Sequence, residues 1–273
     1  MVLGNGIGVP FSKNAVSAGT SYLLDNLSAA PDVIMSPSKI FSSTYETAAI
    51  IRLRRTSDDA EANFTGAEVA AGADLTWVGS QTSFVRYVYD QSGNSKDLDQ
   101  SIAGIQGQYT DASGNRIAMS DGNAAPQQIV DRGMKLPALG FTGSDGAAVF
   151  RFNGGTDTDW QLLIDEDTNS IYLAAALNRS SAAPSFGVGG APVIKINGTT
   201  LSPYNKGTFN ANVTGADVTV RITDINWSAK PDWNTEIMYL TLIGNPKMSS
   251  VALYNSEPSS ADLDLIVNAF EAT

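Results

Sequence analysis

The stretch FVRYVYDQSGNSKDLDQ, residues 84–100, decides the fold class of this chain. Aromatic and β-branched residues dominate its first half, as they do in a half-buried strand. A regular strand would divide these residues between two faces, with Phe84, Arg86, Val88 and Asp90 on one and Val85, Tyr87 and Tyr89 on the other. The pattern therefore predicts a strand that delivers a polar loop to one edge of a sheet.

The loop itself, Asp90–Asn94, is a dense turn signal of acid, amide, serine and glycine. Two roles compete for it. Its carboxylate and amides suit sugar hydroxyls, which makes Asp90, Gln91 and Asn94 candidate glycan-binding residues. Alternatively the loop is a structural plug, in which Asp90 and Asn94 bond their own backbone as Asx-turns do. We favour the structural role.

Composition excludes several classes of function. The 273 residues include 17 Lys and Arg against 28 Asp and Glu, so the net charge is −11 and nucleic-acid binding is not expected. Without histidine or cysteine, the chain lacks the commonest general base, thiolate chemistry and the usual zinc ligands. No segment approaches the roughly 20 apolar residues that span a membrane, and we expect no membrane insertion.

Residues 1–35 are expected to form an N-terminal attachment arm, separate from a main domain at residues 36–273. The beginning of the arm alternates glycine with apolar residues and does not look like a signal peptide. An edge strand on its own domain is the alternative for this segment. The candidate attachment residues are Gly4, Gly6, Gly8, Val9, Pro10 and Phe11.

Short strand patterns separated by turn signals continue through the main domain, including residues 48–55, 148–154, 192–196, 217–222, 235–243 and 251–254. Ser259 or Ser260 then caps a helix with Leu263, Ile266, Val267 and Phe270 on one face. The sequence does not show the alternation of strands and helices that is typical of a parallel sheet. The predicted fold is all-β, an antiparallel sandwich of the jelly-roll, concanavalin A-like type, with a short C-terminal helix.

Three further features offer ligand chemistry. Trp227 and Trp233 flank a turn and would stack on sugar rings if exposed, or cap the end of the core if buried. The acid run at residues 165–169 (DEDTN) has oxygen ligands for calcium, but a solvated hairpin tip is commoner and we expect no cofactor. The mixed charges at residues 54–59 are expected to be a solvated strand end.

Two stretches together resemble a known family. They are Tyr45–Asp59 (YETAAIIRLRRTSDD) and Val85–Gln100 (VRYVYDQSGNSKDLDQ). They are similar to a strand-and-loop pair in fungal arabinofuranosidase B-type enzymes. They resemble more closely the concanavalin A-like lectin domains (laminin G-type) of bacteriophage tail and virion proteins. The resemblance covers roughly residues 38–271, and the Asp90–Asn94 motif is its most specific part.

The resemblance implies a virion structural protein, made in the cytoplasm of the bacterial host and located in the virion. It would be a tail fibre, an adhesin or a capsid decoration protein, anchored by its arm to other tail or capsid proteins. The lectin-like domain would contact host cell-surface polysaccharide, and the chain would form a homo-oligomer such as a trimer. A glycoside hydrolase of arabinofuranosidase type and a separate carbohydrate-binding module are the alternatives. No catalytic residue is assigned, because the catalytic carboxylates of those enzymes lie outside the shared motif.

Overall fold

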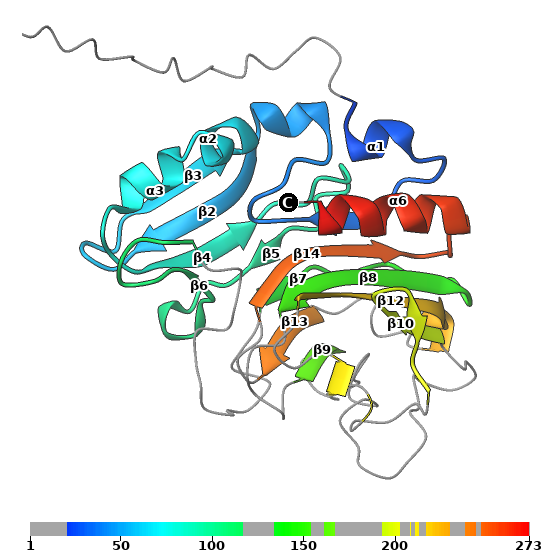
Figure 1. The fold of residues 1–273 in the computed structure, drawn as a ribbon. Coiled ribbons are helices and arrows are strands. Elements are labelled where there is room, and N and C mark those ends of the chain that lie inside the picture. The colour runs from blue at the N-terminus through cyan, green and yellow to red at the C-terminus, as the bar shows by residue number, and fades with distance from the viewer. Residues whose placement is uncertain are drawn as a thin grey trace, which may run out of the picture.

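The chain folds into two antiparallel β-sheets packed as a sandwich, with helices on the outside, in a computed structural model (Figure 1). The residues that the structure describes are 21–116, 134–153, 161–166, 193–202, 208, 211–212, 217–229, 238–243 and 247–272. The expected antiparallel sandwich with a C-terminal helix is confirmed.

Sheet A has six strands, all of them antiparallel to their neighbours. In spatial order they are β1 (Val33–Met35), β14 (Lys247–Tyr254), β8 (Gly146–Asn153), β12 (Asp217–Ile225), β10 (Val193–Ile196) and β11 (Thr199–Thr200). The turn between β10 and β11 is Asn197-Gly198, and both residues have positive φ (46° and 79°) as a tight hairpin requires.

Sheet B has eight strands, also antiparallel. In spatial order they are β3 (Glu61–Thr65), β2 (Ala49–Arg55), β4 (Ser83–Val88), β5 (Leu98–Asp99), β7 (Met134–Leu136), β13 (Met238–Ile243) and β9 (Gln161–Glu166). The short strand β6 (Gln108–Thr110) also pairs with β4.

The main core lies between the sheets, since its buried members come from both. Sheet B contributes Ile51, Leu53, Val85 and Val88, and sheet A contributes Ala148, Phe150, Val218, Val220 and Ile222. In β2 the apolar residues Ile51 and Leu53 are buried while Arg52 and Arg54 lie on the other face, as their alternation predicts.

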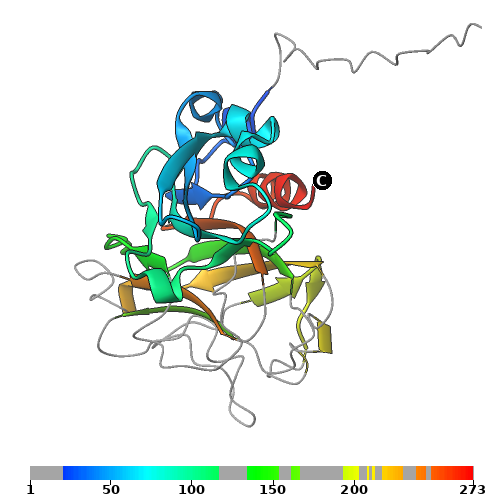
Figure 2. The same ribbon diagram turned by 90° about the vertical axis from the view of Figure 1, so that its left-hand side faces the viewer.

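A second core lies on the opposite face of sheet A, under the C-terminal helix α6 (Ser260–Glu271). Figures 1 and 2 show this helix lying along sheet A. Ser259 caps this helix by accepting a hydrogen bond from the Asp262 N–H. Leu263, Ile266 and Phe270 recur at helical spacing and are all buried against the sheet. Burial of each stabilises the fold by about 1.5–3 kcal/mol.

Shorter helices complete the fold. They are α1 (Leu23–Asn26), α2 (Gly66–Ala70) and α3 (Ala73–Val78), with the 3-10 turns η1 (Ser43–Glu46), η2 (Ala103–Ile105) and η4 (Trp227–Ala229). In the described part of the chain, no helix has the length and hydropathy to cross a bilayer.

Two expectations from the sequence are wrong. Residues 33–35, expected in the arm, form the edge strand β1 of sheet A, because Val33, Ile34 and Met35 are all buried and pair with β14. The expected alternation of β4 breaks at Arg86, where its pairing with β2 shifts by one residue.

This β-bulge in β4 changes which side chains face the solvent. Val85 and Val88 both enter the core, whereas Phe84, Arg86 and Tyr87 are only partly buried. An inserted residue has this effect because it reverses the alternation that follows it. The bulge thus turns Tyr87 away from the core, toward the same side as Arg52, its partner in the register.

Candidate functional site

The loop Asp90–Asn94, which follows β4, joins the two sheets, and we call it the polar clasp. It starts at β4 in sheet B and reaches the free side of β1, the edge strand of sheet A. The Gln91 N–H donates to the Ile34 carbonyl (2.7 Å), and the Ile34 N–H donates to Asp90 Oδ1 (3.0 Å). The clasp therefore continues the hydrogen bonding of sheet A beyond its last strand, and it covers an edge that would otherwise be unpaired.

The Asp90 carboxylate accepts hydrogen bonds from four donors of its own chain. Besides the Ile34 N–H, Oδ1 accepts from the Ser92 N–H (2.9 Å). Oδ2 accepts from the Ser92 hydroxyl (2.7 Å) and the Lys96 N–H (3.1 Å). Asp90 is 1% exposed, so its carboxylate is both buried and fully occupied.

Gln91 fixes the segment that follows β1. Its Oε1 accepts from the Phe41 N–H (2.7 Å), and its side-chain amide donates to the Lys39 carbonyl (2.8 Å). Gln91 is 2% exposed. A glutamine that satisfies one backbone donor and one backbone acceptor acts here as a structural crosslink between segments far apart in the sequence.

Ser92 and Asn94 bind the residue just before β1. The Ser92 hydroxyl and the Asn94 side-chain amide both lie within hydrogen-bonding distance of the Asp32 carbonyl, at 3.0 and 2.9 Å. Asn94 itself is exposed, and it bonds Asp32 rather than its own backbone. The Asx-turn expected for Asp90 is present, whereas the one expected for Asn94 is not.

These contacts correct two of the glycan-binding candidates. Asp90 and Gln91 are buried and their polar atoms are bonded within the protein, so they have nothing to offer a sugar. Burial raises the pKa of Asp97, whose carboxylate accepts from the Asp90 N–H, and the neighbouring charge of Asp90 adds to the increase. The structure supports the structural interpretation of the loop.

Trp227 is the third candidate that the structure corrects. It is 0% exposed, packs edge-on against Phe141 at 5.2 Å between ring centroids, and donates its indole N–H to the Tyr254 carbonyl (2.8 Å). A Cβ added to Gly146 would lie 1.7 Å from Trp227 Nε1, so only glycine leaves room for the indole at this position. The indole is buried in the main core and cannot stack on a sugar.

Other candidate residues lie outside the described part of the chain. These are Trp233 and the attachment residues Gly4, Gly6, Gly8, Val9, Pro10 and Phe11. Of the acid run considered for calcium, Asp165 and Glu166 end strand β9, and residues 167–169 are not described. Among described residues, no group of three or more acids is placed to hold a metal ion.

The outer face of β2, β3 and β4 carries an arginine–aromatic network, which we call the arginine face. Arg52 and Arg86 both lie over the Tyr87 ring, at 4.9 and 4.4 Å, and Tyr87 stacks on Tyr89 at 5.8 Å. Arg54 lies over the Phe84 ring at 5.1 Å. The bulge at Arg86 makes this network feasible, because it places Arg86 and Tyr87 on the same side.

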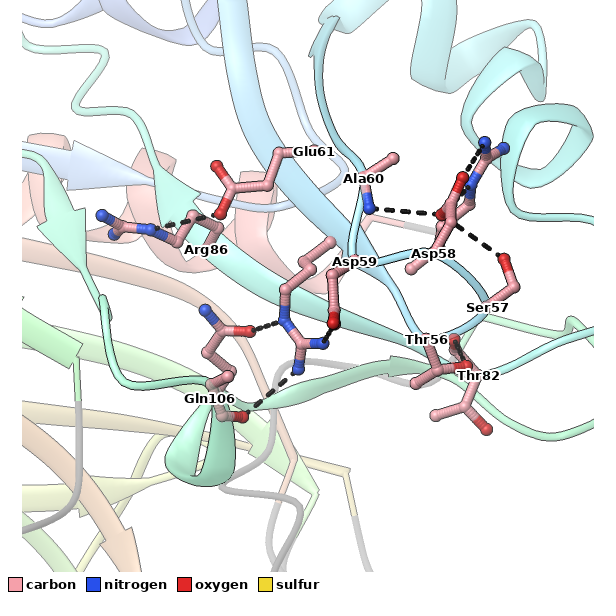
Figure 3. A network of polar contacts seen from close by, with 12 residues as sticks. Thr56, Ser57, Asp58, Asp59, Ala60, Glu61, Thr82, Arg86 and Gln106 are labelled. Carbon is pink, nitrogen blue, oxygen red and sulfur yellow. Dashed lines mark hydrogen bonds and ion pairs between the residues drawn. The ribbon is translucent and has the colours of Figure 1, made fainter.

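Acids neutralise the arginine face (Figure 3). Glu61 lies between Arg86 (3.6 Å) and Arg52 (3.9 Å), and Arg86 also pairs with Asp99. Figure 3 shows the Glu61–Arg86 pair. Arg54 pairs with Asp59 at 2.6 Å and donates to Gln106 Oε1 at 2.7 Å. Since these guanidinium groups already have partners, the face is a preassembled network rather than an open anion site.

The end of β2 carries the mixed charge cluster expected from the sequence. Arg55 binds Asp58 through two contacts of 2.8 Å, and Ala60 donates its N–H to the same carboxylate (Figure 3). The guanidinium lowers the pKa of Asp58 to about 2. The pair lies in a partly exposed turn, as expected for a solvated strand end.

The sequence analysis did not predict an ion pair with a buried carboxylate. Asp74 in α3 is 0% exposed and binds Arg116 through contacts of 2.8 and 2.5 Å, while the Tyr109 hydroxyl donates to it at 2.7 Å. Burial and the adjacent carboxylate raise the pKa of Tyr109. These residues are far apart in sequence and form no motif, so no local signal could have revealed them.

The comparisons with known proteins give distant structural similarity. No family model matches the chain, and no curated protein matches it. A GH54 α-L-arabinofuranosidase soaked with a cyclic sulfate inhibitor superposes with a TM-score of 0.48 at 17% identity. A mutant of GH54 α-L-arabinofuranosidase soaked with 4-nitrophenyl α-L-arabinofuranoside gives 0.47 at 15%.

A third structure, an arabinofuranosidase complexed with arabinofuranosyl-α-1,2-xylobiose, gives a TM-score of 0.43 at 14% identity. Each alignment covers 88% of this chain and 62% of the other, so this chain spans less than two thirds of the proteins that it matches. The expected similarity to arabinofuranosidases is therefore found as a distant structural similarity.

Proposed function

We propose that this protein is a non-catalytic structural component of a bacteriophage virion, which presents its β-sandwich for contact with host cell-surface glycans. It would serve as a tail fibre, an adhesin or a capsid decoration protein. The assignment to a virion comes from the sequence resemblance, and the polar clasp carries the non-catalytic part of the proposal. The most specific motif of the chain joins the two sheets, and every Asp90 acceptor is bonded within the protein.

The arginine face supports a non-catalytic role. Glycosidases need two carboxylates facing a common space, one of them able to donate a proton. Glu61, Asp59 and Asp99 are the carboxylates bonded to the arginines of this face, and each is paired with a guanidinium. Their arrangement favours a rigid surface over a catalytic pair.

The proposal assigns attachment to the N-terminal segment. Residues 21–35 belong to the folded body, since the apolar residues of α1 pack near α6 and β1 completes sheet A. The glycine-rich sequence at residues 1–20 is left for binding other tail or capsid proteins, with the chain as a homo-oligomer such as a trimer.

Purified particles test this proposal. Full-length protein and a variant lacking residues 1–20 are each supplied during phage assembly, and particles are isolated by density gradient and quantified by mass spectrometry. We expect the full-length chain in the particles and the truncated chain in the soluble fraction. Equal incorporation of the two would refute the anchoring role, and absence of both from particles would refute the virion assignment.

A further inference from the structure

A hollow of about 420 Å³ lies between α6 and the outer face of sheet A. It is lined by Arg151, Asn197, Gly198, Asp217, Val267 and Glu271. These residues come from β8, the β10–β11 turn, β12 and α6, and Figure 1 shows α6 running along this side of the sheet. Its volume lies at the small end of ordinary ligand sites, about 300–1,000 Å³.

Thr219 lies next to residues that line this hollow. It lies opposite Arg151 in the β8–β12 register and two residues from Asp217, so the three share one face of the sheet. Its N–H donates to Asn197 Oδ1 (2.8 Å), which fixes it beside the turn. Thr219 is 2% exposed, yet its hydroxyl has no hydrogen-bond partner among the described residues. A buried hydroxyl without a partner is unfavourable and calls for a ligand or an ordered water.

Two arginines at or near the hollow have guanidinium donors without a partner among the described residues. No described residue forms a hydrogen bond or ion pair with the Arg151 guanidinium, whose charge contributes to lowering the pKa of Lys39 beyond the larger effect of burial. Arg221, two residues from Thr219, pairs with Asp264 at 3.1 Å, but its buried Nε has no partner within the described chain. Donors are therefore available next to the carboxylates of Asp217 and Glu271.

This mixture of groups selects a class of ligand. Two carboxylates disfavour an anion, and the guanidinium of Arg151 disfavours a metal ion. A neutral polyol fits both, because each of its hydroxyls donates and accepts. Val267 adds a small apolar surface for the C–H face of a ring. We propose that the hollow binds one sugar residue of a neutral glycan. The proposal rests on the glycan contact in the proposed function, and it is independent of location in a virion.

Saturation-transfer NMR on the full chain tests the site, with the methyl glycosides of glucose, galactose, rhamnose and N-acetylglucosamine as probes. We expect at least one to bind with a Kd of about millimolar. Arg151→Gln should weaken this binding about tenfold or more, since it removes a charged donor. Thr219→Val should weaken it about three- to tenfold.

Thermal unfolding separates binding from folding. Thr219→Val replaces an unpartnered buried hydroxyl by a methyl group, so Tm should be unchanged or raised while binding is weakened. Thr223→Val on the same strand is the matched control, because the Thr223 hydroxyl approaches Asp224 and the residue pairs with Val193, at the end of β10 away from the Asn197-Gly198 turn. It should leave affinity unchanged.

The outcomes separate the two proposals. If Arg151→Gln and Thr219→Val both bind the glycoside with wild-type affinity, the proposed site in the hollow is wrong. The glycan contact of the proposed function would still stand. If no glycoside binds the wild-type chain, the hollow proposal is overturned, whereas the assignment to a virion is decided by particle incorporation alone.

Discussion

Replacing Asp90 by alanine should destabilise the protein strongly, because the change removes the centre of the polar clasp. The Ile34 N–H is fully buried and would lose its acceptor, at a cost of about 1–3 kcal/mol. The donors of Ser92 and Lys96 would lose a charged acceptor, and water could replace it only in part. The combined loss is about 3–5 kcal/mol. For a chain of 273 residues it lowers Tm by about 5–9 °C.

Differential scanning calorimetry measures the change in Tm, and hydrogen exchange at residues 33–35 locates it. We expect faster exchange of β1 amides in the variant, since the clasp covers that edge. Asp264→Ala is the matched control, because Asp264 is an ion-paired but largely exposed acid with 69% side-chain exposure and lies in helix α6, where alanine fits the backbone. An Asp90→Ala variant with wild-type Tm, unchanged exchange and lost glycan binding would refute the structural interpretation.

Three further predictions follow from single contacts. Gly146→Ala should displace the Trp227 indole, lower the stability by about 3 kcal/mol and shift tryptophan fluorescence, whereas unchanged urea unfolding would contradict the packing. Tyr109→Phe should cost about 2 kcal/mol in urea unfolding, because it removes a donor to a buried carboxylate; a cost near zero would contradict the contact. Arg55→Gln should raise the pKa of Asp58 from about 2 toward its usual value near 4, measured by carboxyl NMR titration. This pair stabilises the fold above pH ~4 and loses its effect as pH falls through about 2, so the variant should show less acid sensitivity in that window.

The sandwich and about half of its described strands could be predicted, because their signals are local. The alternation of apolar residues and arginines in β2 and the Asn-Gly pair at residues 197–198 are both patterns of adjacent residues that the structure contains. The cap at Ser259 and the apolar face of α6 were equally visible in the sequence. Each of these patterns involves residues that are near one another along the chain, so it can be recognised in the sequence.

The faces of β4 could not be predicted, because a β-bulge depends on pairing with another strand. The shift at Arg86 leaves Tyr87 on the outer side and makes the arginine face. A sequence pattern cannot reveal it, since both alternations of FVRYVYD bury β-branched residues.

The polar clasp was recognised as structural, but its partner was not. The sequence suggested that the loop bonds itself, which Asp90 does through Ser92 and Lys96, but Asp90 also holds Ile34, and Gln91 holds Lys39 and Phe41. These last three partners lie about fifty residues earlier in the chain and donate or accept through backbone groups, which carry no sequence signal. A tryptophan in a predicted loop looks the same in the sequence whether its side chain is exposed or buried, and Trp227 is buried.

Immunogold electron microscopy of purified phage particles, with an antibody against the folded domain, tests whether the protein belongs to the virion. We expect gold at one fixed place on intact particles, either the tail or the capsid surface. Unlabelled particles in a lysate that contains abundant folded protein would contradict it.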